Sequence, residues 1–275
     1  MLKRTITAVV AIALFIPVCV FSDTIIFPIV MALLSAVGVF EMLGCVGVRK
    51  HYIISALSLI LGAAMPLIPY FTDENTIEIE CALCVLYLIG VYATDVFSKG
   101  KLDYTISAST FMGVFYIAVS FTCITLLREN GKYLYLFVFI GPWVSDTFAY
   151  IFGRLLGKHK LIPEISPKKT IEGSIAGIIF SAAAFALYGF IINRYFDSSA
   201  NTSYLLLVIS GALVSVISQL GDLSASAVKR RFGVKDYGFI FPGHGGVMDR
   251  FDSVIMTAPI LYIISCLPMT SGFLI

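Results

Sequence analysis

The chain has 275 residues, of which 59% are hydrophobic and 13% are charged, and its formal net charge is +2. A soluble domain usually carries about 25% charged residues, so this composition is that of a protein with many membrane-spanning segments. Nine spans of roughly 20 residues and their loops use the whole length, which excludes a separate soluble domain or a nucleic-acid-binding module.

Nine apolar stretches follow one another along the chain. A segment in lipid must satisfy its own backbone hydrogen bonds, and the stretches lack the alternation of a barrel strand, so we expect an all-α protein. The first stretch lacks a clear small-residue cleavage site and is interpreted as a span rather than a signal peptide. The predicted spans are residues 5–21, 24–48, 51–71, 77–97, 104–127, 133–157, 173–196, 203–231 and 252–269.

The basic residues predict the orientation of these spans. With the N-terminus in the cytoplasm, sixteen of the 19 Lys and Arg residues fall on the cytoplasmic side, as the positive-inside rule requires. The C-terminus is then extracytoplasmic, and the two long polar loops, about 158–172 and 232–251, are cytoplasmic. We expect residues 1–130, with spans one to five, to serve as scaffold and dimer surface, and residues 131–275 to form the catalytic region.

The first part of the chain offers few residues suited to chemistry. Glu41 and Asp95 lie near span ends and are interpreted as side chains that reach towards water. The six cysteines fall in apolar stretches, so we expect free thiols rather than a metal or redox site.

Span eight carries a polar stripe on an otherwise apolar helix. Its members recur at three- and four-residue intervals, which places them on one face: Gln219, Asp222, Ser226, and Lys229 or Arg230. Asp222 lies about 28 Å along the helix from Ser203, near the far edge of a roughly 30 Å apolar core. The stripe therefore predicts a carboxylate at the depth of the inner-leaflet phosphates.

The loop after span eight is rich in glycine and charge. Gly245 and Gly246 would let backbone N–H groups approach an anion, and Asp249 and Arg250 stand at the start of span nine. Asp252, beside them, could instead be only the N-cap of that span. Asp222 and Asp249 are expected to approach the same interface from opposite chain directions, as oxygen ligands suited to magnesium.

Span six repeats the pattern and continues into the other polar loop. Asp146, Tyr150 and Arg154 are spaced by four residues, so they share one helix face. In the following SPKKTIEG segment, Lys168 and Lys169 would suit either a triphosphate or the anionic membrane surface.

Residues 226–252, SAVKRRFGVKDYGFIFPGHGGVMDRFD, carry a recognisable pattern. The segment resembles the signature of the phosphatidate cytidylyltransferase (CDP-diacylglycerol synthase) family, roughly SxxKR, four residues, KD, then PxHGGxxDRxD. The sequence around Asp222 and the segment from Asp146 to Gly173 also resemble that family, whereas the first five spans match only in hydropathy. Ala225 stands where we would expect an acidic residue.

The resemblance implies transfer of CMP from CTP to phosphatidate, giving CDP-diacylglycerol and pyrophosphate. It also implies a magnesium requirement, with a second cation left open, a homodimer, and a bacterial-type plasma membrane with the active site facing the cytoplasm. Asp222 and Asp249 would bind the metal. The other catalytic candidates are Ser226, Lys229, Arg230, Lys235, Asp236, His244 and Arg250, and the substrate-binding candidates are Asp146, Tyr150, Lys168, Lys169, Gly245 and Gly246. As mechanism we expect direct in-line attack of the lipid phosphate on the α-phosphorus of CTP.

A cation-coupled transporter is the alternative, because it too would place carboxylates such as Asp146 and Asp222 inside the membrane. Its weakness is position. The charged groups gather at one end of their spans, whereas the outer halves of spans six and eight are almost wholly apolar.

Overall fold

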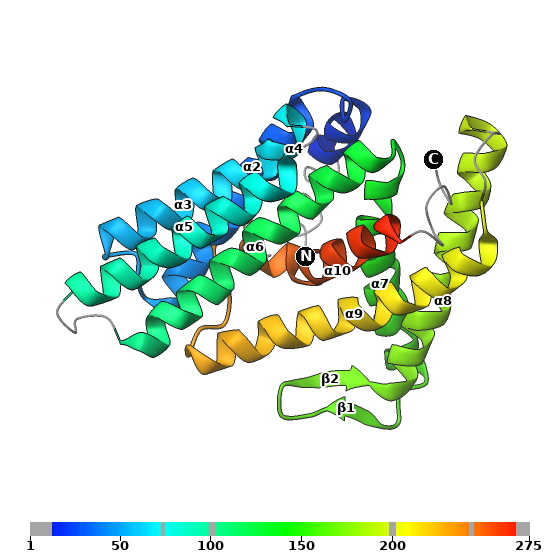
Figure 1. Ribbon diagram of the computed structural model, residues 1–275. Coiled ribbons are helices and arrows are strands. Elements are labelled where there is room, and N and C mark those ends of the chain that lie inside the picture. The colour runs from blue at the N-terminus through cyan, green and yellow to red at the C-terminus, as the bar shows by residue number, and fades with distance from the viewer. Residues whose placement is uncertain (1–12, 73–74, 99–102, 198–201, 242–244, 268–275) are drawn as a thin grey trace. The chain divides into compact units, whose positions relative to one another are not determined.

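The computed structural model describes residues 13–72, 75–98, 103–197, 202–241 and 245–267. Within them the helices and one β-hairpin form the regular secondary structure (Figure 1). It divides into two compact units, one formed by residues 1–125 and 232–251 and the other by residues 126–231 and 252–275. The loop after span eight thus belongs to the unit built from the N-terminal spans.

The first unit consists mainly of long apolar helices, with α2 packed on α3 and α3 on α5. Residues 13–20, in the first predicted span, are helical as well. Buried side chains such as Phe27, Val39 and Ile117 form its core. Its named elements are α2 (Ile26–Val46), α3 (Tyr52–Ala64), the 3₁₀ turn η1 (Met65–Leu67), α4 (Ile68–Phe71), α5 (Thr76–Phe97) and most of α6 (Tyr104–Asn130).

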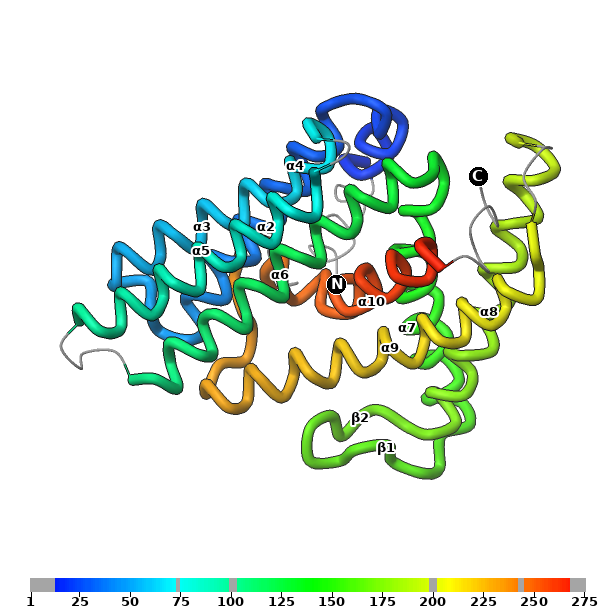
Figure 2. The backbone as a smooth tube through the Cα atoms, in the orientation of Figure 1, coloured from blue at the N-terminus to red at the C-terminus, as the bar shows by residue number. Residues whose placement is uncertain are grey.

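The second unit is organised around α8, which packs against both α7 and α9. Its elements are η2 (Leu134–Leu136), α7 (Phe137–Leu155), β1 (Lys160–Ile162), β2 (Ser166–Thr170), α8 (Ile171–Ile191), the π-helical turn η3 (Ile192–Phe196), α9 (Tyr204–Arg231) and the greater part of α10 (Met248–Cys266). The hairpin connects the end of α7 to the start of α8 (Figure 2).

Seven helical segments among the described residues are long and apolar enough to cross a membrane, and they match the second to eighth predicted spans. The protein is therefore a helical integral membrane protein with several spans. The ninth predicted span corresponds to α10, which begins at Met248, four residues earlier than expected, and includes Asp249, Arg250 and Asp252. The count of nine and the orientation of the termini stay predictions.

The antiparallel hairpin of β1 and β2 lies in the first polar loop, where no strand is expected from the sequence. At its base His159 Nδ1 lies 2.7 Å from a carboxylate oxygen of Glu172, and the N–H of Ile171 donates to the carbonyl of His159. Thr170 caps α8 by accepting a hydrogen bond from Gly173 N at 3.2 Å. These contacts fix the hairpin to the first turn of α8.

Candidate active site

A cavity of about 530 Å³, lined by many polar and charged residues, lies in the second unit between α7, the hairpin, α8 and α9. Its lining brings together five of the candidates named from the sequence. These are Asp146 and Tyr150 from α7, Lys168 and Lys169 from β2, and Asp222 from α9. The remaining polar lining residues are Arg154, Lys160, Ser166, Thr170, Ser174 and Gln219.

Charge is paired and concentrated around Asp222. Its carboxylate forms an ion pair with the ammonium group of Lys169, and both side chains are partly exposed to the cavity. Asp146 and Asp252 both lie within electrostatic range of Asp222, and Lys229 lies within electrostatic range of Asp252. Three carboxylates and two lysines thus lie close together in the second unit, and Asp146, Asp222 and Lys169 among them line the cavity.

Close approach of α7 to α8 gives the cavity its wall. A Cβ atom on Gly173 would lie 2.5 Å from the carbonyl oxygen of Ala149 and 3.0 Å from the Cα atom of Gly153. Only hydrogen atoms fit between the helices there, so α8 starts directly against the last turns of α7. That contact holds β2, with Lys168 and Lys169, beside the stripe of Asp146, Tyr150 and Arg154.

The floor of the cavity is a hydrogen-bonded network centred on Gln219, which is only 7% exposed. Its Oε1 accepts from the hydroxyl of Ser174, and its Nε2 donates to the carbonyl of Ser174 and to Ser215 Oγ, each at 3.2 Å. Ser215 and Ser145 continue the network at 2.7 Å. These partners use both N–H groups and the carbonyl oxygen of the amide, so hydrogen bonds within the second unit hold Gln219 in the cavity lining.

Asp249 lies in the first unit, where it organises the glycine-rich loop. Its Oδ2 accepts hydrogen bonds from Tyr237 N at 2.8 Å and Gly246 N at 3.0 Å. Gly245 adopts a φ of 86°, which favours glycine. The N–H of Gly246 is therefore bound within the protein, and the substrate-binding role of Gly245 and Gly246 stays a prediction.

The remaining candidates are divided between the units. Ser226, Lys229 and Arg230 lie in the last turns of α9, in the second unit, and do not line its cavity. Lys235, Asp236 and Arg250 are exposed residues of the first unit, and His244 lies outside the described residues. Asp222 and Asp249 belong to different units, so their convergence stays a prediction. Asp252 lies in the second turn of α10, so the interpretation of this residue as an N-cap is wrong.

The donor chemistry fits magnesium, since the acidic side chains around Asp222 offer only oxygen ligands. Among the described residues, no group of three or more His, Cys, Asp or Glu side chains is arranged to hold a metal ion. Magnesium commonly binds through one or two carboxylates plus substrate phosphates, so a dedicated protein cage is not required. Asp222 could bind such an ion when the ammonium group of Lys169, now paired with it, binds a substrate phosphate instead.

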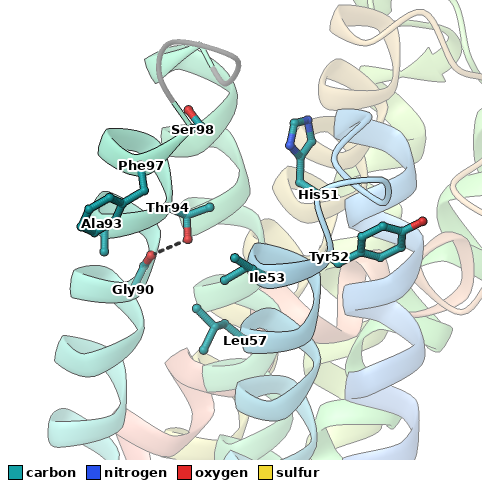
Figure 3. A pocket seen from close by; sticks show the side chains of 9 residues that line it. All are labelled: His51, Tyr52, Ile53, Leu57, Gly90, Ala93, Thr94, Phe97 and Ser98. Atoms are coloured by element: carbon teal, nitrogen blue, oxygen red, sulfur yellow. Dashed lines mark hydrogen bonds between the residues drawn. The ribbon is translucent and has the colours of Figure 1, made fainter.

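A second cavity, of about 470 Å³, lies within the first unit between α3 and α5 (Figure 3). Its lining is mostly apolar, including Ile53, Leu57 and Phe97, and the only titratable nitrogen in it belongs to His51. The nine lining residues include neither lysine nor arginine. This cavity is therefore poorly suited to a triphosphate, in contrast to the cavity of the second unit.

Comparison with known proteins extends the likeness over almost the whole chain. The model of the family described as "Cytidylyltransferase family" matches residues 2–267. The phosphatidate cytidylyltransferase of Staphylococcus haemolyticus is 37% identical over 265 residues, covering 95% of this chain and 97% of the relative. Those of Staphylococcus saprophyticus, over 263 residues, and Staphylococcus aureus, over 265, are each 35% identical with the same coverage.

Proposed function

The chain belongs to the cytidylyltransferase family and is an enzyme of the phosphatidate cytidylyltransferase type, and from this premise we propose how its residues carry out CDP-diacylglycerol synthesis. In the proposed reaction CMP passes from CTP to phosphatidate, and pyrophosphate leaves. The observation that carries the proposal is the cavity of the second unit, which is lined by four cationic side chains and by the carboxylates of Asp146 and Asp222.

The cationic side chains of this cavity suit the triphosphate of CTP. Arg154, Lys160, Lys168 and Lys169 all line it, and ammonium and guanidinium groups form strong charge-assisted hydrogen bonds to phosphate oxygens. Lys169 is held by Asp222, so it is oriented before the nucleotide enters. These four residues would bind and orient the triphosphate.

The lipid phosphate needs little activation before it attacks. A phosphate monoester has a second pKa of about 6, so it is largely ionised near neutral pH and needs no strong general base. One of its oxygens forms a bond to the α-phosphorus of CTP as the bond from that phosphorus to the bridging oxygen of the β-phosphate breaks. The electron pair leaves with pyrophosphate, and Lys229, Arg230, Lys235 and Arg250 would neutralise charge on the reacting phosphates.

We also propose that Asp222 and Asp249 hold magnesium. When bound, the ion would withdraw negative charge from the triphosphate oxygens and help pyrophosphate to leave. A second cation, the homodimer, the bacterial plasma membrane and the cytoplasmic orientation of the site stay part of the same proposal. The positive-inside distribution of Lys and Arg supports the orientation, because CTP is a cytosolic nucleotide. The alternative of a cation-coupled transporter is set aside, since the chain belongs to an enzyme family.

The direct test uses the full-length protein purified in detergent. Incubated with phosphatidate, magnesium and CTP labelled in its α-phosphate, it should transfer the label to the organic phase. CTP labelled in its γ-phosphate should leave the organic phase unlabelled. Absence of transfer from α-labelled CTP, alongside an active relative assayed in parallel, would contradict the proposed function.

The cations of the cavity wall give a second prediction. We expect Arg154→Ala and Lys160→Ala each to raise KM for CTP about tenfold or more, since hydrogen bonds to charged groups contribute about 1.5–3 kcal/mol. KM for phosphatidate should change much less. Lys158→Ala is the matched control, because Lys158 is exposed in the same loop and does not line the cavity. Equal changes in KM for CTP in the Lys158 and Lys160 variants would contradict the assignment of this cavity as the triphosphate site.

A further inference from the structure

Glu41 is a carboxylate in the membrane-spanning helix α2, and it is only 1% exposed. Its two oxygens accept hydrogen bonds from consecutive backbone N–H groups of the first unit. Val247 N donates to Oε1 at 3.0 Å, and Met248 N donates to Oε2 at 2.9 Å. The side chain is thus fully engaged with the start of α10, rather than reaching towards water as its position near a span end suggests.

A buried carboxylate in a membrane helix is costly unless something in the protein compensates it. Here the compensation is the N-terminus of α10, where N–H groups lack partners within the helix and the helix dipole favours negative charge. In return, Glu41 restrains the first turn of that helix. The two residues joined by the first of these hydrogen bonds are 206 positions apart in the sequence. The bond holds the glycine-rich loop against α2.

The backbone of the loop is shaped to accept this side chain. A Cβ atom on Gly238 or on Gly246 would collide with the carboxylate of Glu41, so a side chain at either position would push Glu41 off its hydrogen bonds to the loop. From the other side, Asp249 binds Tyr237 N and Gly246 N. Two carboxylates, one from α2 and one from α10, therefore fix the loop between them.

We propose that Glu41 is a positioning residue that sets the place of Asp249 by holding the N–H groups of the two residues before it. The catalytic consequence of this inference rests on the proposed function, in which Asp249 holds magnesium. A partner that orients a metal ligand commonly contributes 10–100-fold to metal affinity or activity. Removing the carboxylate of Glu41 should therefore raise the magnesium concentration that the enzyme needs, rather than only lower the amount of folded protein.

The experiment compares Glu41→Gln with Glu80→Gln in the full-length protein. Glutamine keeps the size of the side chain, but it turns an NH₂ group towards one of the two N–H donors. Glu80 is a partly buried carboxylate of α5 in the same unit and serves as the matched control. We expect backbone hydrogen exchange of residues 245–248 to become at least about tenfold faster in Glu41→Gln, and the magnesium concentration for half-maximal activity to rise about tenfold. Glu80→Gln should change neither.

A measurement on the unsubstituted protein covers the case in which Glu41→Gln does not fold. The amides of Val247 and Met248 should exchange slowly, although the first N–H groups of a helix normally lack partners. Fast exchange of both amides would overturn the inference, and so would unchanged exchange and magnesium dependence in a folded Glu41→Gln protein. Failure of CMP transfer by the unsubstituted protein would overturn the proposed function instead, while the exchange result would still decide whether Glu41 holds the loop.

Discussion

Replacing Asp222 with asparagine should reduce CMP transfer on the order of a thousandfold, the scale of removing a central electrostatic group from an active site. Asp222 lines the cavity and forms the ion pair with Lys169. An amide of the same shape can neither hold a cation as strongly nor orient that lysine. We would measure transfer of α-labelled phosphate from CTP into the lipid phase.

The folded state should tolerate this change. Asp146 and Asp252 both lie within electrostatic range of Asp222, so removing one negative charge relieves repulsion between carboxylates. Lys169 also acts on Asp146 and so keeps an acidic neighbour. Asp103→Asn, at an exposed residue before α6, is the control and should keep full activity. Turnover by Asp222→Asn within about threefold of the unsubstituted protein would contradict the proposed role, because the expected loss is on the order of a thousandfold.

Replacing Asp249 with asparagine should have two effects, a comparable loss of transfer and a local loss of stability. Its Oδ2 accepts two backbone hydrogen bonds in a buried position, and hydrogen bonds to a charged acceptor contribute about 1.5–3 kcal/mol. Asparagine keeps one acceptor but removes the charge. We therefore expect a lower Tm in detergent and faster proteolysis of residues 237–249.

The contrast between the two substitutions separates their roles. Asp222→Asn should lose activity at nearly unchanged Tm, whereas Asp249→Asn should lose both. Equal Tm values for the two variants would show that the hydrogen bonds of Asp249 add little to the fold. Full activity of a folded Asp249→Asn protein would remove the residue from the proposed magnesium site.

Most of the helices could be predicted from the sequence because each is a continuous apolar run. Span eight, predicted at 203–231, is α9 at Tyr204–Arg231, and span four, predicted at 77–97, is α5 at Thr76–Phe97. The start of α10 could not be found this way, because its first turn contains Asp249 and Arg250. That turn is stabilised by Glu41, a partner from another part of the chain.

The β-hairpin escaped prediction for a related reason. Its strands have three and five residues and include polar side chains and Pro167, so neither apolar runs nor a regular alternation marks them. Pairing of His159 with Glu172 closes the hairpin, and no pattern in the sequence indicates a contact between these two residues, 13 positions apart.

Part of the candidate site could be predicted from the spacing of polar residues along the helices. Asp146, Tyr150 and Arg154 share a helix face, as their intervals of four predict, and all three line the cavity. Arg154 lies on that predicted face, so residue spacing indicates its place in the cavity as well. Lys160 had no comparable signal, because a single lysine in a loop predicts nothing about where its side chain points. The role of Glu41 could not be predicted, since position along a helix does not reveal a partner distant in sequence.

The contact of α7 with α8 at Gly153 and Gly173 also bears on how this enzyme can change over evolutionary time. Exposed apolar positions of the membrane-spanning helices, such as Leu213 in α9, should tolerate exchange for other apolar residues, because no close contact with the protein constrains their shape. Even alanine at residue 173 would force the two helices apart, since its methyl group would meet the backbone of Ala149 and Gly153. Mutational tolerance should thus be low even at a residue that performs no chemistry itself, and a library of variants selected for growth should retain glycine at 173 as strictly as aspartate at 222.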